Sequence, residues 1–280
     1  MGAYDVEQLE GQVRGALLAG PRSHRTGVIV LGGLSGSVDL VRAGLFAETG
    51  AKASALQWFG GAGQSPGICE IPLETFVAAT DYLLSKDCER IVFVGTSKGA
   101  EAALLVATID QCVDAVVAIS PSSVLWGNVG PGIDGIAWPE RSSWSFEGSP
   151  LDFVPADPHW ERDYRDGLVS HRSLFEKRLT ADHHATRRAQ ILIERASGDV
   201  ILVAGGDDAL WPSDTYARDL ARRREAHGKS MSLVFELDAG HRVLLPGEAT
   251  PRSKLQAHGG RDEADARLGQ KAWQVIAPLL

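Results

Sequence analysis

The sequence predicts an α/β fold built on a mostly parallel central sheet flanked by helices. Short apolar runs recur along the chain, each bounded by Gly or Asp, and segments with helical spacing lie between them. Strands and helices that alternate in this way form βαβ units. With 280 residues, 44% of them hydrophobic, the chain is long enough to bury one large core, so we expect a single domain over residues 1–280.

Six apolar runs are the expected strands, because strands buried on both faces of a sheet read as continuous apolar stretches. They cover residues 28–31, 53–58, 91–94, 115–119, 200–204 and 233–237. Helical spacing predicts four helices, over residues 72–85, 98–109, 214–227 and 264–276. Pro72 suits the opening of the first helix, while Ser213 and Gly228 suit the N-cap and the stop of the third.

Residues 121–190 interrupt this alternation. Gly, Pro and Ser are frequent here, and no strand or helix period is evident. Irregular segments of this length in a compact domain are usually lids or binding loops, so we expect a lid; a surface insert without function is the alternative. Four tryptophans are scattered through the segment: Trp126, Trp138, Trp144 and Trp160.

Composition excludes several functional classes. The formal charge of -8 argues against nucleic acid as a partner, because phosphate binding needs clustered Lys and Arg. The three cysteines, Cys69, Cys88 and Cys112, fit neither a disulfide framework nor a zinc site, so we expect a reducing compartment and no metal. The N-terminal stretch is acidic and no apolar run is long enough to cross a membrane. We therefore expect a cytoplasmic protein without membrane contact.

The segment Gly95-Thr96-Ser97-Lys98-Gly99 has the sequence and the context of a nucleophile elbow. It follows the apolar run RIVFV and opens the helix-compatible run AEAALLVA, which together give a strand, a tight turn and a helix. The flanking glycines fit a turn too cramped for larger side chains. Ser97 is therefore the expected nucleophile, and a turn serine without function is the alternative.

A second GxSxG match, Gly63-Gln64-Ser65-Pro66-Gly67, provides an internal comparison. The residue after a nucleophilic serine donates its backbone N–H to the oxyanion, and Pro66 has no N–H to donate. The preceding residues FGGA also supply no strand that runs directly into the turn. We therefore expect Ser65 to be a loop serine.

A serine hydroxyl needs a general base, and the base needs a carboxylate that holds its tautomer. His241 follows the apolar run LVFEL, and Asp208 closes the segment DVILVAGGDD, so both lie at strand ends, where ligands of open α/β sheets bind. Asp207 is the alternative acid. The competing histidines do not directly follow an expected core strand; they are His159, His171, His183, His184, His227 and His258.

Backbone amides are expected to form the oxyanion hole: the N–H of Lys98, and an N–H of Gly33 or Leu34 in the glycine-rich loop after the first parallel strand. That loop lacks the GxGxxG and GxxxxGK[ST] spacings, so it is not a nucleotide site. The Lys98 side chain opposes the helix dipole, so it holds a substrate anion or a nearby carboxylate, or else it is solvated. The run Arg222-Arg223-Arg224 fits either coenzyme A phosphates or, more commonly, a solvated helix face.

The chain resembles the catalytic α/β-hydrolase domain of the acyl-CoA thioesterase and bile acid-CoA:amino acid N-acyltransferase family. The resemblance runs from about Val13 to the C-terminus and is carried by GTSKGAEAALLVA, VDAVVAISPSSVLW, SSWSFEG, VILVAGGDDALWPS, AGHR and WQVIAPLL. It implies an α/β-hydrolase fold with Ser97, Asp208 and His241 as the catalytic triad. It also implies cleavage of an acyl thioester through an acyl-serine intermediate, with coenzyme A or carrier-protein pantetheine entering as part of the substrate and no bound cofactor.

Two departures from the family bear on function. Larger members carry an immunoglobulin-like domain ahead of this one, and few residues precede the resemblance here. Members that transfer the acyl group to an amino acid tend to use cysteine, so Ser97 favours water as the acceptor. Acyl transfer to an amine or alcohol, hydrolysis of a carboxylester, lactone or peptide, and non-catalytic binding are the alternatives. Trp138 and Trp144 could line an acyl pocket or a subunit contact.

Overall fold

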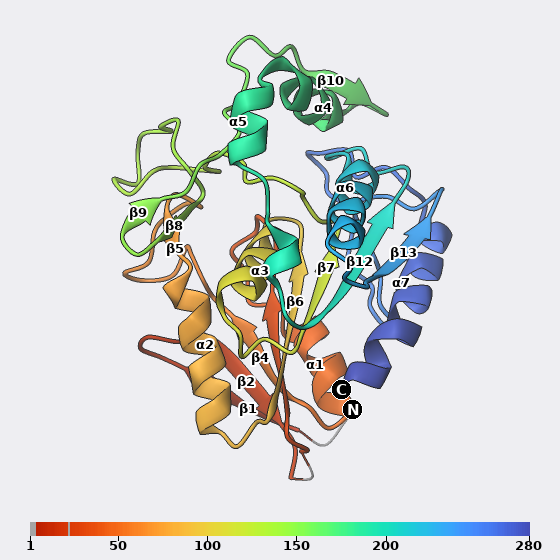
Figure 1. The fold of residues 1–280 in the computed structure, drawn as a ribbon. Coiled ribbons are helices and arrows are strands. Elements are labelled where there is room, and N and C mark those ends of the chain that lie inside the picture. Colours follow the sequence, from red (N-terminus) through yellow and green to blue (C-terminus); the bar gives the residue numbers. More distant parts are fainter. Residues whose placement is uncertain (1–3, 22) are drawn as a thin grey trace.

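One eight-stranded sheet forms the centre of the protein in a computed structural model, which describes residues 4–21 and 23–280 (Figure 1). Its strands are β1 Asp5–Leu9, β2 Gly15–Ala19, β3 Thr26–Leu31, β4 Lys52–Leu56, β6 Arg90–Thr96, β7 Ala115–Ile119, β12 Asp199–Gly205 and β13 Ser232–Glu236. The strand order is β1-β2-β4-β3-β6-β7-β12-β13. Strand β2 is antiparallel to both of its neighbours, and the remaining pairs are parallel, which confirms the predicted mostly parallel sheet.

Helices cover both faces of this sheet (Figure 1). One hydrophobic cluster joins the sheet to α2 Glu74–Ser85, α3 Lys98–Ile109 and α6 Ser213–Ala226. A second cluster joins the opposite face to α1 Leu40–Glu48 and α7 Asp262–Ile276, which runs into the short helix η2 Ala277–Leu279. The protein is thus a three-layer sandwich of helices, sheet and helices.

The central strand β6 shows why the predicted strands are apolar throughout. Its side chains alternate between the two clusters, with Ile91 and Phe93 facing α2 and α3, and Val92 and Val94 facing α1 and α7. All four are fully buried. A strand covered on both faces has no solvated side, so the period of two that marks a half-exposed strand disappears.

The structure confirms the six predicted strands and the four predicted helices, and it corrects two helix boundaries. Pro72 does not open α2; it belongs to the short strand β5 Ile71–Pro72, and the helix begins two residues later. Ser213 is not the N-cap of α6 but its first residue, and its hydroxyl serves the candidate active site instead. Gly228 follows α6 with φ of 68°, as a helix stop requires.

The segment between β7 and β12 lies partly in the core and partly beyond the sheet. It holds β8 Trp144–Phe146, β9 Ser149–Pro150, β10 Asp163–Arg165, β11 Leu168–Ser170, α4 Arg172–Ala181, α5 His183–Arg188 and the short helix η1 Ile193–Arg195. Figure 1 shows α4, α5 and β10 beyond the carboxyl ends of β12 and β13. This is the place expected for a lid.

The tryptophans of this segment take different roles. Trp126 and Trp144 are buried in the cluster with α2 and α3, whereas Trp138 is 73% exposed. Trp144 is therefore too deeply buried to line a subunit contact, and its indole N–H donates to Glu101 inside the core. None of the helices in the described parts of the chain is both long and apolar enough to span a membrane. Cys69, Cys88 and Cys112 are free thiols.

Candidate active site

Ser97 sits at the turn between β6 and α3 with φ of 57° and ψ of -119°, a backbone conformation that L-residues other than glycine rarely adopt. Its own N–H donates to the carbonyl of Ile119 at the end of β7, at 2.9 Å. The turn is thereby held against the neighbouring strand. Such a strained serine between a strand and a helix is the geometry of a nucleophile elbow.

The flanking glycines are required by close backbone contacts. A Cβ atom at Gly95 would lie 2.2 Å from the carbonyl oxygen of Gly99, and one at Gly99 would lie 2.4 Å from the carbonyl oxygen of Gly32. Neither contact can be relieved by a side-chain rotation, because both involve backbone atoms. The GxSxG spelling here follows from packing at the elbow, in line with the expectation from sequence.

Asp208 is fully buried in the loop after β12, and four donors converge on its carboxylate. Oδ1 accepts from the backbone N–H groups of Leu210 and Trp211, at 2.9 and 3.2 Å. Oδ2 accepts from the Ser213 hydroxyl at 2.6 Å and lies 2.8 Å from Nδ1 of His241. The carboxylate is therefore fixed in the orientation that holds Nδ1 protonated and leaves Nε2 as a base.

His241 lies in the loop after β13 and is only 6% exposed. Its carbonyl accepts from the hydroxyl of Ser120 at 2.8 Å, and Ser120 directly follows Ile119, the partner of the Ser97 N–H. The loops that carry the serine and the histidine are thus both attached to the end of β7. No hydrogen bond between Ser97 Oγ and the imidazole is present among the described residues.

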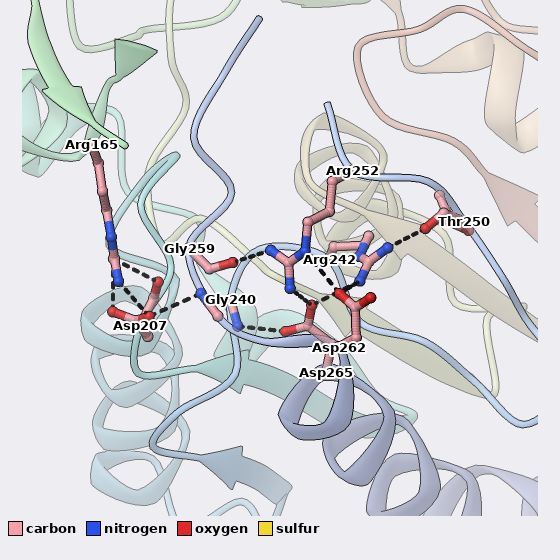
Figure 2. Close-up of polar contacts among 10 residues, drawn as sticks. Arg165, Asp207, Gly240, Arg242, Thr250, Arg252, Gly259, Asp262 and Asp265 are labelled. Atoms are coloured by element: carbon pink, nitrogen blue, oxygen red, sulfur yellow. Dashed lines mark hydrogen bonds and ion pairs between the residues drawn. The ribbon is translucent and has the colours of Figure 1, made fainter. Parts of the chain in front are cut away.

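The neighbouring Asp207 has a different partner. Its carboxylate accepts two hydrogen bonds from the guanidinium of Arg165 in β10, both at 2.7 Å, and a third from the N–H of Gly260 (Figure 2). The Arg165 guanidinium is the main reason why the pKa of Asp207 lies below its ordinary value. Asp207 therefore ties the segment between β7 and β12 to the loop before α7, and Asp208 is the carboxylate that contacts the imidazole.

The other histidines lie outside this arrangement. His258 is the nearest, with its ring 5.7 Å from that of His241, and burial lowers its pKa to about 4. Among the described residues its ring forms no ion pair with a carboxylate, and its backbone carbonyl accepts from the His241 N–H at 2.8 Å. His171 stacks on Trp160 within the segment between β7 and β12. The remaining candidates named from sequence are exposed at the surface: His159, His183, His184 and His227.

Two predicted oxyanion donors border the same cavity as Ser97. The cavity has a volume of about 210 Å³, and its lining includes Leu34, Ser97 and Lys98. A Cβ atom at Gly33 would lie 3.9 Å from Ser97 Oγ, so the glycine-rich loop passes directly beside the hydroxyl. The Lys98 N–H is at the first position of α3, where no intrahelical acceptor is available.

The Lys98 side chain is not solvated; it is 2% exposed and pairs with Glu101 at 2.9 Å. Glu101 Oε1 also accepts from the backbone N–H of Trp126 and from the indole N–H of Trp144, at 3.1 and 2.6 Å. The sequence left three partners open for the Lys98 side chain: a substrate anion, a nearby carboxylate or solvent. The structure supports the nearby carboxylate. Burial lowers the pKa of Lys98, and Glu101 opposes this effect.

The three arginines of the run on α6 bind groups within the protein. Arg222 pairs with Asp219, Arg223 with Glu194, and the buried Arg224 donates to backbone carbonyls that include those of Ser230 and Ile193. The coenzyme A reading of this run is thus not supported. Ser65 lies in the loop between β4 and β5, where its hydroxyl donates to the carbonyl of Gly67.

A charged network that sequence reasoning missed supports the histidine loop (Figure 2). The carboxylate of Asp265 in α7 is fully buried and accepts from the N–H of Gly240, the residue before His241, at 2.8 Å. Its other oxygen accepts from Arg252 and from Arg242, the residue after His241, at 3.1 and 3.4 Å. The histidine is thus flanked by two residues that are attached to the same carboxylate.

A second buried pair joins the elbow to the histidine loop. Arg42 in α1 is 6% exposed, and its guanidinium donates to the hydroxyl of Thr96, the residue before Ser97, at 2.5 Å. The same guanidinium makes two bonds to Glu248, at 2.8 and 2.7 Å, and one to the carbonyl of Val243. No sequence signal marks this pair, because its members lie far apart along the chain.

No group of His, Cys, Asp or Glu residues within the described ranges is arranged to hold a metal ion. The arrangement is that of acyl-transfer chemistry: a serine at a strained elbow, an acid–histidine pair, and amides beside the hydroxyl. Together with the sheet order, it defines a protein of the α/β-hydrolase fold class.

Solved structures share this fold at low sequence identity. Est1E from Butyrivibrio proteoclasticus is 15% identical, with a TM-score of 0.52 and 99% of each chain covered. A puromycin-hydrolyzing peptidase of Mycobacterium tuberculosis is 13% identical, with a TM-score of 0.58, and the match covers 99% of this chain and 38% of that one. These similarities confirm the predicted fold.

Comparison with sequence families gives a closer relationship. Residues 71–279 match the family described as BAAT / Acyl-CoA thioester hydrolase C terminal, and the chain belongs to this family, as the resemblance predicted. Acyl-coenzyme A thioesterase 5 of Mus musculus is 29% identical over 287 residues, and acyl-coenzyme A thioesterase 1 of Homo sapiens is 26% identical over 278 residues. The matches cover 98% and 95% of this chain but only 64% and 62% of those two proteins.

Proposed function

We propose that this protein is a serine hydrolase that cleaves an acyl thioester, with coenzyme A or the pantetheine of a carrier protein as the departing thiol. The observation that carries the proposal is the contact of the buried Asp208 with Nδ1 of His241, on the same sheet edge as the strained Ser97. Membership of a family described by acyl-CoA thioester hydrolysis supports the choice of substrate class.

Acylation uses Ser97 as the nucleophile. Nε2 of His241 takes the hydroxyl proton as Oγ attacks the thioester carbonyl, and Asp208 stabilises the imidazolium that forms. The N–H of Lys98, with an N–H of Gly33 or Leu34, stabilises the negative charge on the carbonyl oxygen. The intermediate collapses, the carbon–sulfur bond breaks, and the imidazolium returns its proton to the departing thiolate.

Deacylation repeats these steps with water in place of serine. His241 takes a proton from water as the water oxygen attacks the acyl-serine ester, and the same two amides stabilise the oxyanion. Collapse releases a carboxylic acid and restores the Ser97 hydroxyl with the proton from His241. A serine nucleophile favours water over an amine acceptor in this second half of the cycle.

The test is turnover of a substrate panel by the purified protein and its Ser97→Ala variant. Acyl-CoA and acyl-pantetheine thioesters are followed by release of free thiol, and p-nitrophenyl esters by release of p-nitrophenolate. Thioester turnover that falls by roughly a thousandfold or more in Ser97→Ala would support the proposal. Ester turnover without thioester turnover would overturn the substrate class.

Labelling provides a second measurement on the same samples. A fluorophosphonate that labels the parent protein and not Ser97→Ala would support the serine mechanism even for an untested substrate. Absence of labelling and of turnover would contradict enzyme function and favour a binding protein. Products that contain an added glycine or alcohol would assign acyl transfer in place of hydrolysis.

The proposal includes one domain over the chain, with residues 121–190 as its lid, and a cytoplasmic location. Strands from both sides of the lid segment lie in one sheet, which favours a single cooperative unit. Two calorimetric unfolding transitions would contradict the single domain. Among the relatives, acyl-coenzyme A thioesterase 2 of Homo sapiens is named as mitochondrial, so fractionation of cells that express the native protein tests the location.

A further inference from the structure

A cation without a carboxylate partner lines the cavity that contains Ser97. Arg178, in the last turn of α4, is a lining residue of this cavity and is partly buried. Its Nε donates to the carbonyl of Pro155 at 2.9 Å, which fixes the guanidinium and leaves its other donors available. No ion pair of Arg178 is present in the described part of the chain. The other lysine or arginine at the cavity, Lys98, is neutralised by Glu101.

The acid that follows Arg178 in the sequence binds other groups. Asp182 lies four residues after Arg178, but its carboxylate caps α5 by accepting from the N–H groups of His184 and Ala185. The hydrogen bond from Ala185 is the main reason why the pKa of Asp182 is lowered, and Arg178 is the last contributor. His171, a titratable neighbour on the lining, has its pKa lowered by burial, which favours the neutral ring, and an imidazole supplies no negative charge to neutralise Arg178.

The rest of the cavity wall is mainly apolar. Most of the lining consists of aromatic and aliphatic side chains, and its polar amides come from Asn128 and Gln256. A guanidinium beside such a wall interacts more strongly with an anion than it would in water, and its planar fork matches a carboxylate.

We propose that the acyl group carries a terminal carboxylate that binds Arg178, so that the substrates are monothioesters of short dicarboxylic acids. This inference rests on the proposed thioester hydrolysis and names its substrate class. The methylene chain lies along the apolar wall between Ser97 and Arg178. The cavity, at about 210 Å³, is larger than the cavity of about 150 Å³ that holds benzene, so a short acyl chain fits in it.

A phosphate of coenzyme A is the competing anion. The pantetheine arm separates the phosphates of coenzyme A from the thioester, so groups close to the thioester carbonyl are the ones that occupy the cavity of Ser97. The Pro155 carbonyl holds Arg178 at this cavity. The acyl terminus is therefore the anion that this arginine is placed to bind.

The experiment compares matched thioesters that differ only at the acyl terminus. Succinyl-, glutaryl- and adipyl-CoA are paired with butyryl-, pentanoyl- and hexanoyl-CoA, and kcat/KM is measured for the parent protein, Arg178→Gln and Arg178→Lys. The matched control is Lys177→Gln, which removes an exposed positive charge from the adjacent position of α4. The same pairs are repeated as N-acetylcysteamine thioesters, which lack the phosphates.

The parent protein is expected to prefer the carboxylated member of at least one pair by about tenfold or more. Arg178→Gln should lose that preference with both the CoA and the N-acetylcysteamine thioesters, because its kcat/KM falls for the carboxylated substrates alone. Arg178→Lys should keep part of it, and Lys177→Gln all of it. A parent protein without the preference overturns the proposal. The proposal is also overturned if Arg178→Gln lowers kcat/KM equally for the carboxylated and the uncarboxylated CoA thioester and leaves kcat/KM for the N-acetylcysteamine thioesters unchanged. Arg178 would then bind a phosphate of coenzyme A.

Binding separates failure of this inference from failure of the proposed hydrolysis. Calorimetric titration of Ser97→Ala with glutaryl-CoA and pentanoyl-CoA needs no turnover. The inference is supported, whatever the turnover assay gives, if Ser97→Ala binds glutaryl-CoA about tenfold more tightly than pentanoyl-CoA and the double variant Ser97→Ala/Arg178→Gln does not. Equal affinities overturn it even if both thioesters are hydrolysed.

Discussion

The backbone N–H of Gly240 donates to the buried carboxylate of Asp265 at 2.8 Å, so the residue before His241 is held by the helix that follows the histidine loop. The second oxygen of Asp265 binds Arg252 and Arg242, and burial raises the pKa of the carboxyl while these donors oppose the shift. A single carboxylate thus fixes the loop on both sides of the proposed base.

Asp265→Asn should destabilise the protein and slow catalysis. Loss of the charge leaves Arg242, whose side chain is 8% exposed, without its buried partner, at a cost of about 3 kcal/mol. We expect kcat to fall by about tenfold with little change in KM, because the imidazole is less well positioned. Urea unfolding and steady-state kinetics measure the two effects. The control Asp262→Asn, at a 67% exposed side chain, should stay within about 0.5 kcal/mol of the parent; equal behaviour of the two variants would contradict the positioning role.

The adjacent aspartates provide a matched pair for the catalytic acid. Asp208→Asn should lower kcat by roughly ten-thousand-fold, because the amide no longer enforces the required tautomer of His241. Asp207→Asn breaks the contact with Arg165 instead, so its kcat should stay within about tenfold of the parent value. Kinetics of both variants on one thioester decide the assignment. The reverse ranking would make Asp207 the acid.

His258 should make the protein less stable in mild acid. Its pKa is lowered from 6.5 to about 4 by burial, so the unfolded chain binds a proton more readily than the folded protein. Stability contributed by the neutral ring is therefore complete above about pH 6.5 and is lost as the pH falls toward 4. His258→Gln should lose less stability than the parent between pH 7 and pH 4.5, as measured by urea unfolding. Parallel losses in the two proteins would contradict this role of His258.

The buried Lys98–Glu101 pair predicts a strong non-additive effect. Lys98→Met leaves the Glu101 carboxylate, whose side chain is 0% exposed, with N–H donors but no cation, and should cost about 3–5 kcal/mol of unfolding free energy. Adding Glu101→Gln removes the unpaired charge and should restore at least half of that loss. Urea unfolding of the two single variants and the double variant measures the coupling. Strictly additive losses would show that the pair is not a unit.

Sequence reasoning located the central sheet because its strands are buried on both faces and therefore read as uninterrupted apolar runs. The predicted strands do not include β1 and β2. The edge strand β1, DVEQL, is exposed over most of its length and has no such run. Strand β2, GALLA, is a buried apolar run, so exposure does not explain its omission. Helix α1 also went unpredicted. It is short, with nine residues, and its Arg42 interrupts the apolar sequence although the side chain is buried.

The candidate triad could be proposed from sequence because each member lies in the turn or loop that follows a strand of the sheet. The supporting residues could not. Arg42 reaches Glu248, and Arg165 reaches Asp207, across long stretches of chain, and these approaches exist only once the layers have packed. The sequence predicts a capping position for Ser213, yet its hydroxyl donates to Asp208 because the start of α6 lies beside the loop that carries this acid.

The guanidinium of Arg172, at the start of α4, donates to the backbone carbonyl of Asp208 and to the carboxylate of Asp214. The loop that carries Asp208 is therefore contacted by Arg172, which is synthesised before it. His241, which contacts the Asp208 carboxylate, is synthesised after it. A ribosome-bound chain carries Ser97 long before Asp208 and His241 have been synthesised. The proposed nucleophile therefore gains its proposed base only after residue 241 has been synthesised.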